Sequence, residues 1–435
     1  MAFAIFLLTL ILVIWQPRGL GIGFSALGGA LLALATGVVS WQDVPTVWAM
    51  VWNATFTLVA LVIISLILDE AGFFKWLALL VARGGGGRGR LLFVLVILLG
   101  ALVTALLTND GTALIWTPTV MEMLLVLGFN PGATLAFVFA TGFIADATSS
   151  PLPVSNLVNI IAADYFHISF LRYTLVMVPV NFVAIAFSLA VLCFYFDRHI
   201  PARYNLTCLP PPANAIRDQV VCRWSFLILG LLLIGYFFAA PLSIPVSFIA
   251  GTSALVMLAL AGRWFHKDKT AVIEIRQILR EAPWQVILFS LGMYLVVIGL
   301  RDAGMTALIN QQLRQLSTWG VTLSATGTGF LAALLSGVMN NLPTVLINAL
   351  AIPDATGIDP GVQEVMVYAN IVGCNIGAKI TPIGSLSTLL WLNVLARKGL
   401  RISWIQYVRI ALILTVPVLF ASLLSLAVWL PWLIA

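Results

Sequence analysis

The stretch "GFIADATSSPLPVSN", residues 142–156, decides the fold of this chain. Apolar runs lead into it and away from it, yet it contains an aspartate, four hydroxyl side chains and two prolines. Proline removes a backbone donor and breaks a helix, and glycine tolerates the unwound backbone that results. A second such stretch, "GCNIGAKITPIGSLS", occupies residues 373–387. Paired broken apolar helices are the best indication in a sequence of a secondary transporter's binding site.

The composition predicts a polytopic, all-α membrane protein. Of the 435 residues, 61% are hydrophobic and only 9% are charged, whereas soluble domains carry about 25% charged residues. Many apolar runs approach the roughly 20 residues that cross a bilayer as a helix. The net charge of +6 comes mostly from loop arginines and lysines, so it reports topology and does not indicate nucleic-acid binding.

The sequence indicates no cofactor, metal site or enzymatic activity. The four cysteines show no paired spacing, so neither a disulfide framework nor a zinc site is suggested. No metalloprotease, serine-hydrolase or P-loop motif is present. An enzyme and a built-in ATPase therefore have little support.

Apolar runs between polar breaks predict ten membrane spans. The first five are 2–15, 20–38, 48–68, 132–163 and 171–195, and the second five are 222–239, 243–262, 283–300, 361–396 and 403–432. Two further apolar segments, 89–127 and 321–351, are each cut near the middle by polar residues.

The two halves of the chain resemble each other. "LDEAGFF" at 68–74 aligns with "LRDAGMT" at 300–306, and one register shift of 231 carries Asn109 onto Asn340 and Gly142 onto Gly373. We therefore expect a first repeat over 1–195, a cytoplasmic linker over 196–221 and a second repeat over 222–435. Because each repeat holds an odd number of spans, the second must enter the membrane from the opposite side, as in inverted-repeat transporters.

The distribution of basic residues predicts the orientation. With both termini on the outer side, the outer loops keep only Arg172, Arg301 and Arg314, which agrees with the positive-inside rule. This topology requires 89–127 and 321–351 to be re-entrant hairpins, the first from the cytoplasm and the second from outside. Irregular backbone at such depth survives only beside protein or a water-filled cavity. The two hairpin tips, Asn109-Asp110-Gly111 and 339–343, are therefore expected to meet near the midplane.

Four ionisable residues are predicted to lie within the membrane, where a central charge costs roughly 2.5–3.5 kcal/mol. Asp146 lies two residues from Thr148, the repeat mate of Lys379, so an Asp146–Lys379 ion pair is expected. It either locks the broken helices together or couples transport to protons, and both roles stay open. Asp110, at a hairpin tip, is the stronger candidate for titration, with an Asx-turn as the alternative. Glu122 is interpreted as structural or interfacial.

Neutral polar side chains supply hydrogen-bond donors and acceptors at the tips and breaks. Asn109 and Asn340 are the first candidates for substrate contact, and Ser387 belongs to the same polar group. About half of such residues are expected only to cap half-helices and satisfy broken backbone. The candidate substrate-binding residues are Thr108, Asn109, Thr148, Ser149, Ser150, Ser155, Asn156, Asn340, Asn341, Asn375, Thr381 and Ser385.

Several long strings resemble one known family. "LLTNDGTALIWTPTV", "GFIADATSSPLPVSNLVNI", "MNNLPTVL" and "VYANIVGCNIGAKITPIGSLSTLLWL" are similar to the bacterial arsenite permeases, the membrane subunits of arsenical resistance pumps. The similarity covers nearly the whole chain. It implies the ion transporter superfamily fold, with scaffold and transport domains and elevator-type movement in the bacterial inner membrane. It further implies export of arsenite and antimonite as neutral trihydroxides, driven by protons or by an arsenite-stimulated ATPase that docks from the cytoplasm.

This sequence departs from the family pattern in one motif, and one alternative function stays open. Relatives commonly have "GCDLGPKITP" where this chain has "GCNIGAKITP", so Asn375 replaces an acid and Ala378 a proline. A proton role of that acid would here pass to Asp110 or Asp146. The alternative within the superfamily is a sodium–proton antiporter or a carboxylate symporter. A dicarboxylate carrier should have cationic or sodium-coordinating groups at both tips, whereas this chain offers one lysine, Lys379, at a broken helix.

Overall fold

The computed structural model describes residues 1–264, 272–354 and 357–434. In these ranges the chain is helical and has no strands, apart from one isolated bridge between Arg88 and Arg203. Seven of the described helices are long and apolar enough to cross a membrane. The prediction of an all-α polytopic membrane protein is therefore confirmed, while the count of ten spans stays a prediction.

Helices occupy every predicted span and hairpin arm. The first half contains α1 (Ala2–Trp15), α2 (Ile22–Ala35), α3 (Asp43–Glu70), α4 (Phe73–Gly84), α5 (Gly89–Leu106), α6 (Asn109–Gly111), α7 (Thr117–Val126), α8 (Pro131–Ala147), α9 (Leu157–Tyr165) and α10 (Phe170–Phe196). The second half contains α11 (Gln219–Ala239), α12 (Val246–Ala261), α13 (Ile275–Glu281), α14 (Trp284–Asp302), α15 (Met305–Ser317), α16 (Val321–Met339), α17 (Asn341–Asp354), α18 (Pro360–Gly377), α19 (Leu386–Arg397) and α20 (Trp404–Ile434).

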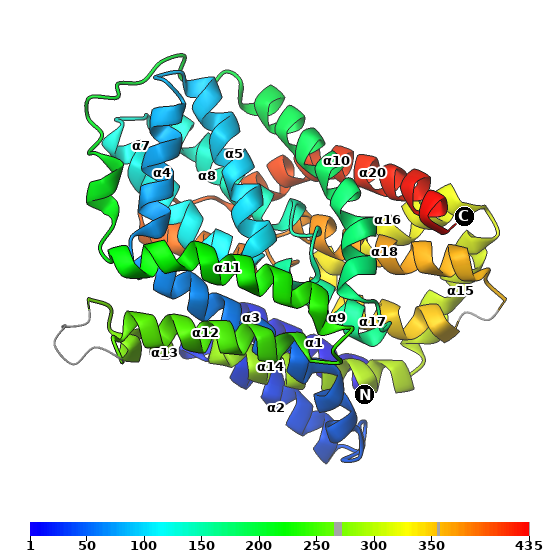
Figure 1. Cartoon of the computed structure of the whole chain (residues 1–435). Coiled ribbons are helices and arrows are strands. Elements are labelled where there is room, and N and C mark those ends of the chain that lie inside the picture. The colour runs from blue at the N-terminus through cyan, green and yellow to red at the C-terminus, as the bar shows by residue number, and fades with distance from the viewer. Residues whose placement is uncertain (265–271, 355–356, 435) are drawn as a thin grey trace.

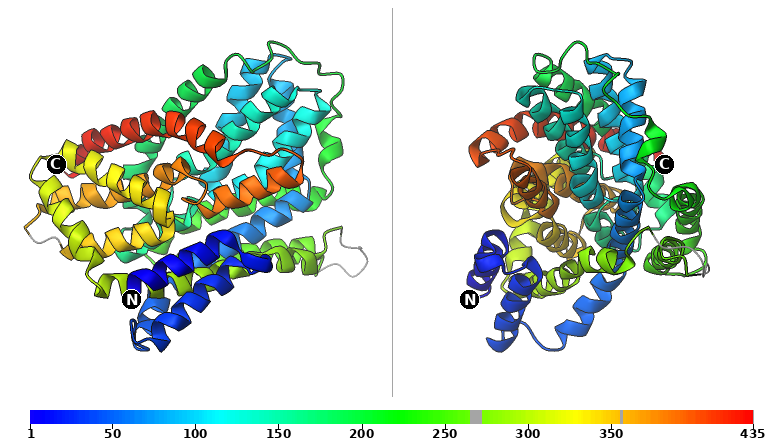
Figure 2. Two further views of the ribbon diagram at one scale, coloured as in Figure 1. Left: turned by 180° about the vertical axis from the view of Figure 1, so that it is seen from behind. Right: turned by 90° about the vertical axis from the view of Figure 1, so that its left-hand side faces the viewer.

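The halves interlock. α14 packs against α2, α3 packs against α12, and α10 packs along α20, so each of these contacts joins one half to the other. In Figures 1 and 2, the blue α1, α2 and α3 lie with α14 along one side, and α10 and the red α20 lie on the other. This exchange of helices is what an inverted duplication would produce, although the duplication itself stays a prediction.

Besides α13, two short helices, α4 and α15, are absent from the sequence-based prediction. Each follows a long helix after a glycine in the left-handed region, Gly72 (φ 84°) or Gly304 (φ 89°). A Cβ atom on Gly72 would clash with the carbonyl oxygen of Ala215. Both helices carry one polar face, so neither stands out as a continuous apolar run in the sequence.

The predicted linker packs against the first half of the chain. The backbone N–H of Tyr204 donates to the Gly87 carbonyl oxygen at 2.9 Å, and that of Arg217 donates to the Ala71 carbonyl oxygen at 2.9 Å. The linker ends at Asp218, whose buried carboxylate accepts hydrogen bonds on both oxygens from the Arg263 guanidinium, each at 2.8 Å. The glycine-rich turn after α4 is thus hydrogen-bonded to the linker.

Candidate functional site

Both predicted helix breaks are present. α8 ends at Ala147, and the chain continues through an irregular segment until α9 begins at Leu157. In the second half, α18 ends at Gly377 and α19 begins at Leu386. Pro151 and Pro382 lie inside these segments, where they have no helical hydrogen bond to remove.

Each hairpin turns at the predicted asparagine. In the first, the helix stops at Leu106, and the Thr108 hydroxyl oxygen accepts a hydrogen bond from the Gly111 N–H at 3.1 Å. In the second, Asn340 has a φ of 78°, and its Nδ2 donates to the Ile383 carbonyl oxygen at 3.0 Å. The next N–H, of Asn341, donates to the Gly384 carbonyl oxygen at 2.8 Å. The second tip is therefore bound to the second helix break through main-chain atoms.

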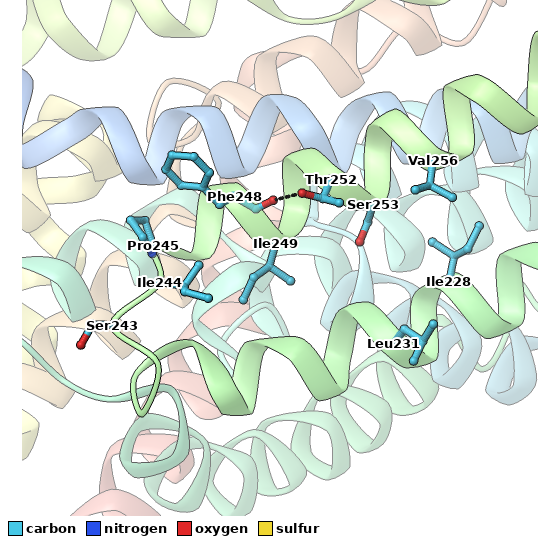
Figure 3. A pocket seen from close by; sticks show the side chains of 10 residues that line it. All are labelled: Ile228, Leu231, Ser243, Ile244, Pro245, Phe248, Ile249, Thr252, Ser253 and Val256. Carbon is cyan, nitrogen blue, oxygen red and sulfur yellow. Dashed lines mark hydrogen bonds between the residues drawn. The ribbon is translucent and has the colours of Figure 1, made fainter. Parts of the chain in front are cut away.

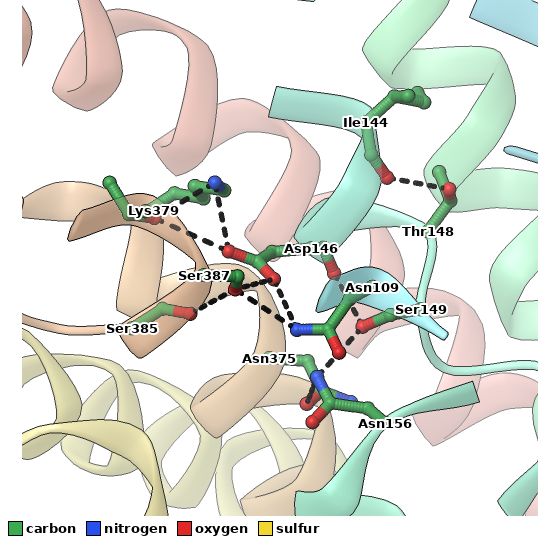
Figure 4. Close-up of polar contacts among 11 residues, drawn as sticks. Asn109, Ile144, Asp146, Thr148, Ser149, Asn156, Asn375, Lys379, Ser385 and Ser387 are labelled. Atoms are coloured by element: carbon green, nitrogen blue, oxygen red, sulfur yellow. Dashed lines mark hydrogen bonds and ion pairs between the residues drawn. The ribbon is translucent and has the colours of Figure 1, made fainter. Parts of the chain in front are cut away.

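The expected ion pair lies between the two breaks. Lys379 Nζ is 2.8 Å from Asp146 Oδ2, and the two side chains are 3% and 1% exposed. Lys379 also donates to the Thr388 hydroxyl at 2.9 Å. Figure 4 shows the pair surrounded by the polar residues of both halves. A buried charge needs such compensation, because unpaired burial is costly.

Asn109 joins the first hairpin tip to this ion pair. Its Nδ2 donates to Asp146 Oδ1 at 2.7 Å and to Ser387 Oγ at 3.1 Å. Its Oδ1 is buried and has no hydrogen-bond partner among the described residues. A buried carbonyl oxygen without a donor is an open acceptor for water or for a ligand.

A second amide cluster connects the breaks beside the ion pair. Asn375 Nδ2 donates to Asn159 Oδ1 at 2.6 Å and to Ser150 Oγ at 3.1 Å. Asn156 Nδ2 donates to Asn375 Oδ1 at 3.0 Å and to Ser149 Oγ at 3.1 Å. These bonds fix the first break against α18 without any charge.

Both hairpin tips line one small cavity of about 20 Å³. That volume holds roughly one water molecule. Its wall combines polar groups with leucine and valine side chains from α3, α9, α14, α17 and α19. The polar lining residues are Asn109, Asp110, Asn156, Asn341, Ser385 and Ser387. Four of them are predicted substrate contacts, and Asp110 is the residue predicted to titrate.

The remaining predicted contacts satisfy main-chain groups or the amide cluster and do not line this cavity. The Thr148, Ser149, Ser155 and Thr381 hydroxyls donate to carbonyl oxygens of the protein. Asn340 likewise bonds to backbone at the second break. In this structure protein groups engage the polar side chains of eight predicted contacts, whose role in substrate binding stays a prediction: Thr108, Thr148, Ser149, Ser150, Ser155, Asn340, Asn375 and Thr381.

Ser387 is more central than the sequence suggests. It is one of three hydroxyl residues in the stretch 373–387, and nothing in the sequence distinguishes it from Ser385. In the structure its Oγ lies between Asn109 and Asp146. The only sequence signal is its place directly after the break, at the start of α19.

The other two ionisable residues have different surroundings. Asp110 lines the cavity, and within the described ranges no lysine or arginine forms a salt bridge with it. Glu122 is half-exposed and pairs with Lys398 at 2.7 Å and Lys75 at 3.5 Å. The structural or interfacial interpretation of Glu122 agrees with these contacts.

An apolar groove on the surface is a different kind of feature. It measures about 750 Å³ and runs between α11 and α12, as Figure 3 shows. Aliphatic and aromatic side chains line it, among them Leu231, Ile244 and Phe248, and no charged group does. Exposed apolar side chains continue along α11 on either side. This groove has the properties of a surface that faces lipid, and we do not assign the transport site to it.

Comparison with solved structures agrees with a transporter fold. The YdaH transporter of Alcanivorax borkumensis, described as having an unusual topology, matches with a TM-score of 0.57 over 90% of this chain and 88% of its own. The two sequences are 15% identical, so this likeness concerns the fold alone.

Comparison of sequences identifies the family. The arsenical pump membrane protein of Escherichia coli K12 is 54% identical over 98% of both chains. A putative arsenical pump membrane protein of Bacillus subtilis is 28% identical over 98% of this chain and 99% of its own. The family model described as "Arsenical pump membrane protein" matches residues 1–430. This chain therefore belongs to the arsenical pump membrane protein family, and it is a membrane transporter and not an enzyme.

Proposed function

We propose that this protein exports arsenic from the cell as the neutral trihydroxide of arsenite, accepts antimonite in the same form, and exchanges each for protons. The observation that carries the proposal is the small cavity between the hairpin tips. It offers amide and hydroxyl groups from both halves, and one open acceptor, Asn109 Oδ1. The 54% identity to a protein named as an arsenical pump supports arsenic as the cargo.

A neutral trihydroxide suits this cavity chemically. It is recognised by hydrogen bonds and needs no counter-ion, and the only cation beside the cavity, Lys379, is neutralised by Asp146 in the described structure. A carboxylate substrate would need that lysine free, which would leave Asp146 buried and unpaired. The ion pair thus favours a neutral cargo over the dicarboxylate alternative.

Asp110 is the better proton carrier of the two candidates. Asp146 has a lysine partner and accepts further hydrogen bonds from Asn109 and Ser387. Protonation of Asp146 would leave the buried Lys379 ammonium group without a negatively charged partner. Asp110 has no salt-bridge partner in the described ranges, so its protonation changes one charge only. We assign proton exchange to Asp110 and the locking of the broken helices to the Asp146–Lys379 pair.

Substrate passage requires the hairpin tips to separate. A cavity of about 20 Å³ holds roughly one water and is too small for a trihydroxide. We therefore interpret this arrangement as closed on both sides, between the two end states of an elevator-type cycle. Export driven by ATP would require a separate arsenite-stimulated ATPase subunit, because the chain has no nucleotide-binding motif of its own.

Resistance assays test the cargo. Expression in an arsenite-sensitive bacterium should raise tolerance of arsenite and antimonite, with no effect on sodium or lithium tolerance. Tolerance of sodium or lithium without arsenite tolerance would favour the sodium–proton antiporter instead.

Everted membrane vesicles test the coupling. Proton-driven arsenite uptake should be lost in Asp110→Asn and retained in Glu122→Gln, which removes a half-exposed carboxylate that does not line the cavity. Asp146→Asn should reduce uptake because Lys379 loses its partner. Wild-type coupling in Asp110→Asn would contradict the assignment of proton exchange to Asp110, and wild-type coupling in both aspartate variants would contradict a role of either carboxylate.

We place the protein in the bacterial inner membrane with both termini on the outer side. The scarcity of outer arginines supports this orientation. Alkaline phosphatase fused to either terminus should be active, since the enzyme folds only outside the cytoplasm. Inactive phosphatase fusions, together with fluorescent fusions of green fluorescent protein at the same termini, would show that the termini lie in the cytoplasm.

A further inference from the structure

A side-chain hydrogen bond joins α3 to α9 at the end of their interface that lies away from the cavity. Asn53 Nδ2 in α3 donates to Asp164 Oδ2 in α9 at 2.7 Å. Asn53 Oδ1 accepts a second hydrogen bond, from the Ser247 N–H in the first turn of α12, at 3.0 Å. A backbone N–H can only donate, so it fixes the orientation of the Asn53 amide. The NH₂ group of Asn53 is therefore held toward Asp164.

The other end of the α3–α9 interface forms part of the cavity wall. α9 packs against α3, and Leu58 of α3 and Leu157 of α9 both line the cavity of about 20 Å³ between the hairpin tips. Leu58 follows Asn53 in the sequence, whereas Leu157 precedes Asp164. In helices these separations correspond to about 8 Å and about 11 Å. The interface thus has the cavity at one end and the Asn53–Asp164 hydrogen bond at the other.

The charge of the carboxylate strengthens this contact. Hydrogen bonds that have an ionised partner are roughly twice as strong as neutral ones. Asn53 and Asp164 are both half-buried, so water competes only in part for the same donor and acceptor. Any movement of α9 away from α3 has to break this bond before the cavity can widen between Leu58 and Leu157.

We propose that Asn53 and Asp164 are positioning residues that latch α9 to α3 and thereby hold the substrate cavity closed. The proposal rests on the proposed function, in which the described arrangement is closed and too small for a trihydroxide. A protein that is mostly closed binds its ligand with an apparent affinity reduced in proportion to the fraction that is open. The latch therefore lowers the apparent affinity for arsenite, and weakening it tightens binding.

The remaining polar contacts of α9 do not replace the latch. Asn156, directly before α9, donates to Asn375 in α18. Asn159 donates to the carbonyl oxygens of Ser149 and Leu152 in the first break, and its Oδ1 accepts from Asn375. These bonds connect α9 to the helix breaks and not to α3, so they persist when α9 leaves α3.

Exchanging the two side-chain types tests the latch. Asn53→Asp keeps an acceptor for the Ser247 N–H and places two carboxylates in contact, so it should release α9. Equilibrium dialysis against the purified full chain should then show arsenite binding about threefold to tenfold tighter than in the wild type. Adding Asp164→Asn restores one amide and one carboxylate in exchanged positions, and the affinity should return to the wild-type value.

Two further variants separate the latch from folding defects. Asp164→Asn alone leaves a neutral acceptor and should tighten binding by a smaller factor, which provides a test if Asn53→Asp does not fold. Asn205→Asp is the matched control, because Asn205 Oδ1 likewise accepts a backbone N–H, that of Thr207 at 2.9 Å, but lies exposed in the linker. This control should leave the affinity unchanged. A purely structural defect would weaken binding and not tighten it.

Each outcome decides one question. Folded single variants that bind arsenite no more tightly than the wild type contradict the latch. A tighter Asn53→Asp that Asp164→Asn does not reverse also overturns it, because Asn53 then acts through another partner. A wild type that binds no arsenite contradicts the proposed cargo, and amide hydrogen exchange then decides on the latch alone. Exchange over 157–165 should be about threefold to tenfold faster in Asn53→Asp and normal in the double variant, and equal exchange in all three proteins contradicts the latch.

Discussion

Asp146 and Lys379 come from different halves of the chain, yet their side chains meet at 2.8 Å inside the protein. Asp146 lies in the last turn of α8, directly before the first helix break, and Lys379 lies in the second break. Neither break has another ion pair in the described ranges. The contact therefore ties the halves together at the place where their backbones are least regular.

Removing one member of this pair should cost much more than removing both. Lys379→Met leaves the Asp146 charge buried and unpaired, with an expected loss of about 3–5 kcal/mol in the free energy of unfolding. The double variant Asp146→Asn, Lys379→Met restores neutrality and should regain most of that loss. Unfolding midpoints of the detergent-purified variants measure the difference. A double variant no more stable than the single one would show that hydrogen bonding, and not charge, dominates.

Gly373 is required by close helix packing. A Cβ atom at this position would clash with the carbonyl oxygen of Gly329 in α16, which is main chain and cannot rotate away. Gly373→Ala should lower the free energy of unfolding by about 1–3 kcal/mol through overpacking. A Cβ atom on Gly230 in α11 would meet no other atom within 4 Å. Gly230→Ala is the matched control and should stabilise by up to about 1 kcal/mol from helix propensity.

The amide cluster should show strong energetic coupling. Asn156 and Asn375 are directly hydrogen-bonded at 3.0 Å, although 219 positions separate them. In a double-mutant cycle with Asn156→Ala and Asn375→Ala, the interaction energy should reach about 0.5–3 kcal/mol. Thermal unfolding of the four proteins gives the cycle. Additive effects would mean that the Asn156–Asn375 bond contributes little and that each asparagine is held by its other partners, Ser149 for Asn156 and Ser150 and Asn159 for Asn375.

Glu122 should matter little for stability. Its ion pairs with Lys398 and Lys75 lie at the surface, with the glutamate side chain 47% exposed. Exposed pairs contribute about 0.2–1 kcal/mol each, and salt screens them. Glu122→Gln should therefore shift the unfolding midpoint slightly at low salt and not at all in about 1 M salt. A large loss of transport in this variant would assign Glu122 a direct role.

The main features of the site can be predicted because they depend on local chemistry. Pro151 and Pro382 break apolar helices wherever they fold, so both breaks are visible in the sequence. The Asp146–Lys379 contact follows from one further step, the alignment of the halves, which brings Thr148 and Lys379 into register.

The rest depends on distances that the sequence does not contain. Ser387 and Ser385 are chemically alike and two residues apart, and only the fold turns Ser387 toward Asn109 and Asp146. Asn340 is the counterpart of Asn109 in sequence, but it turns to the Ile383 carbonyl oxygen. Similar residues in related positions thus acquire different roles once backbone groups compete for them.

The main-chain bond from Asn341 to Gly384 makes the two hairpins mechanically unequal. The second hairpin and the second break are joined by this main-chain hydrogen bond and should move as one rigid body. The first hairpin is joined to the first break and to the ion pair through side chains, by the Ser155 hydroxyl on the Ala105 carbonyl oxygen and by the Asn109 amide on Asp146. Opening of the pathway should therefore begin on the side of the first hairpin, so that the cycle has a built-in order of events.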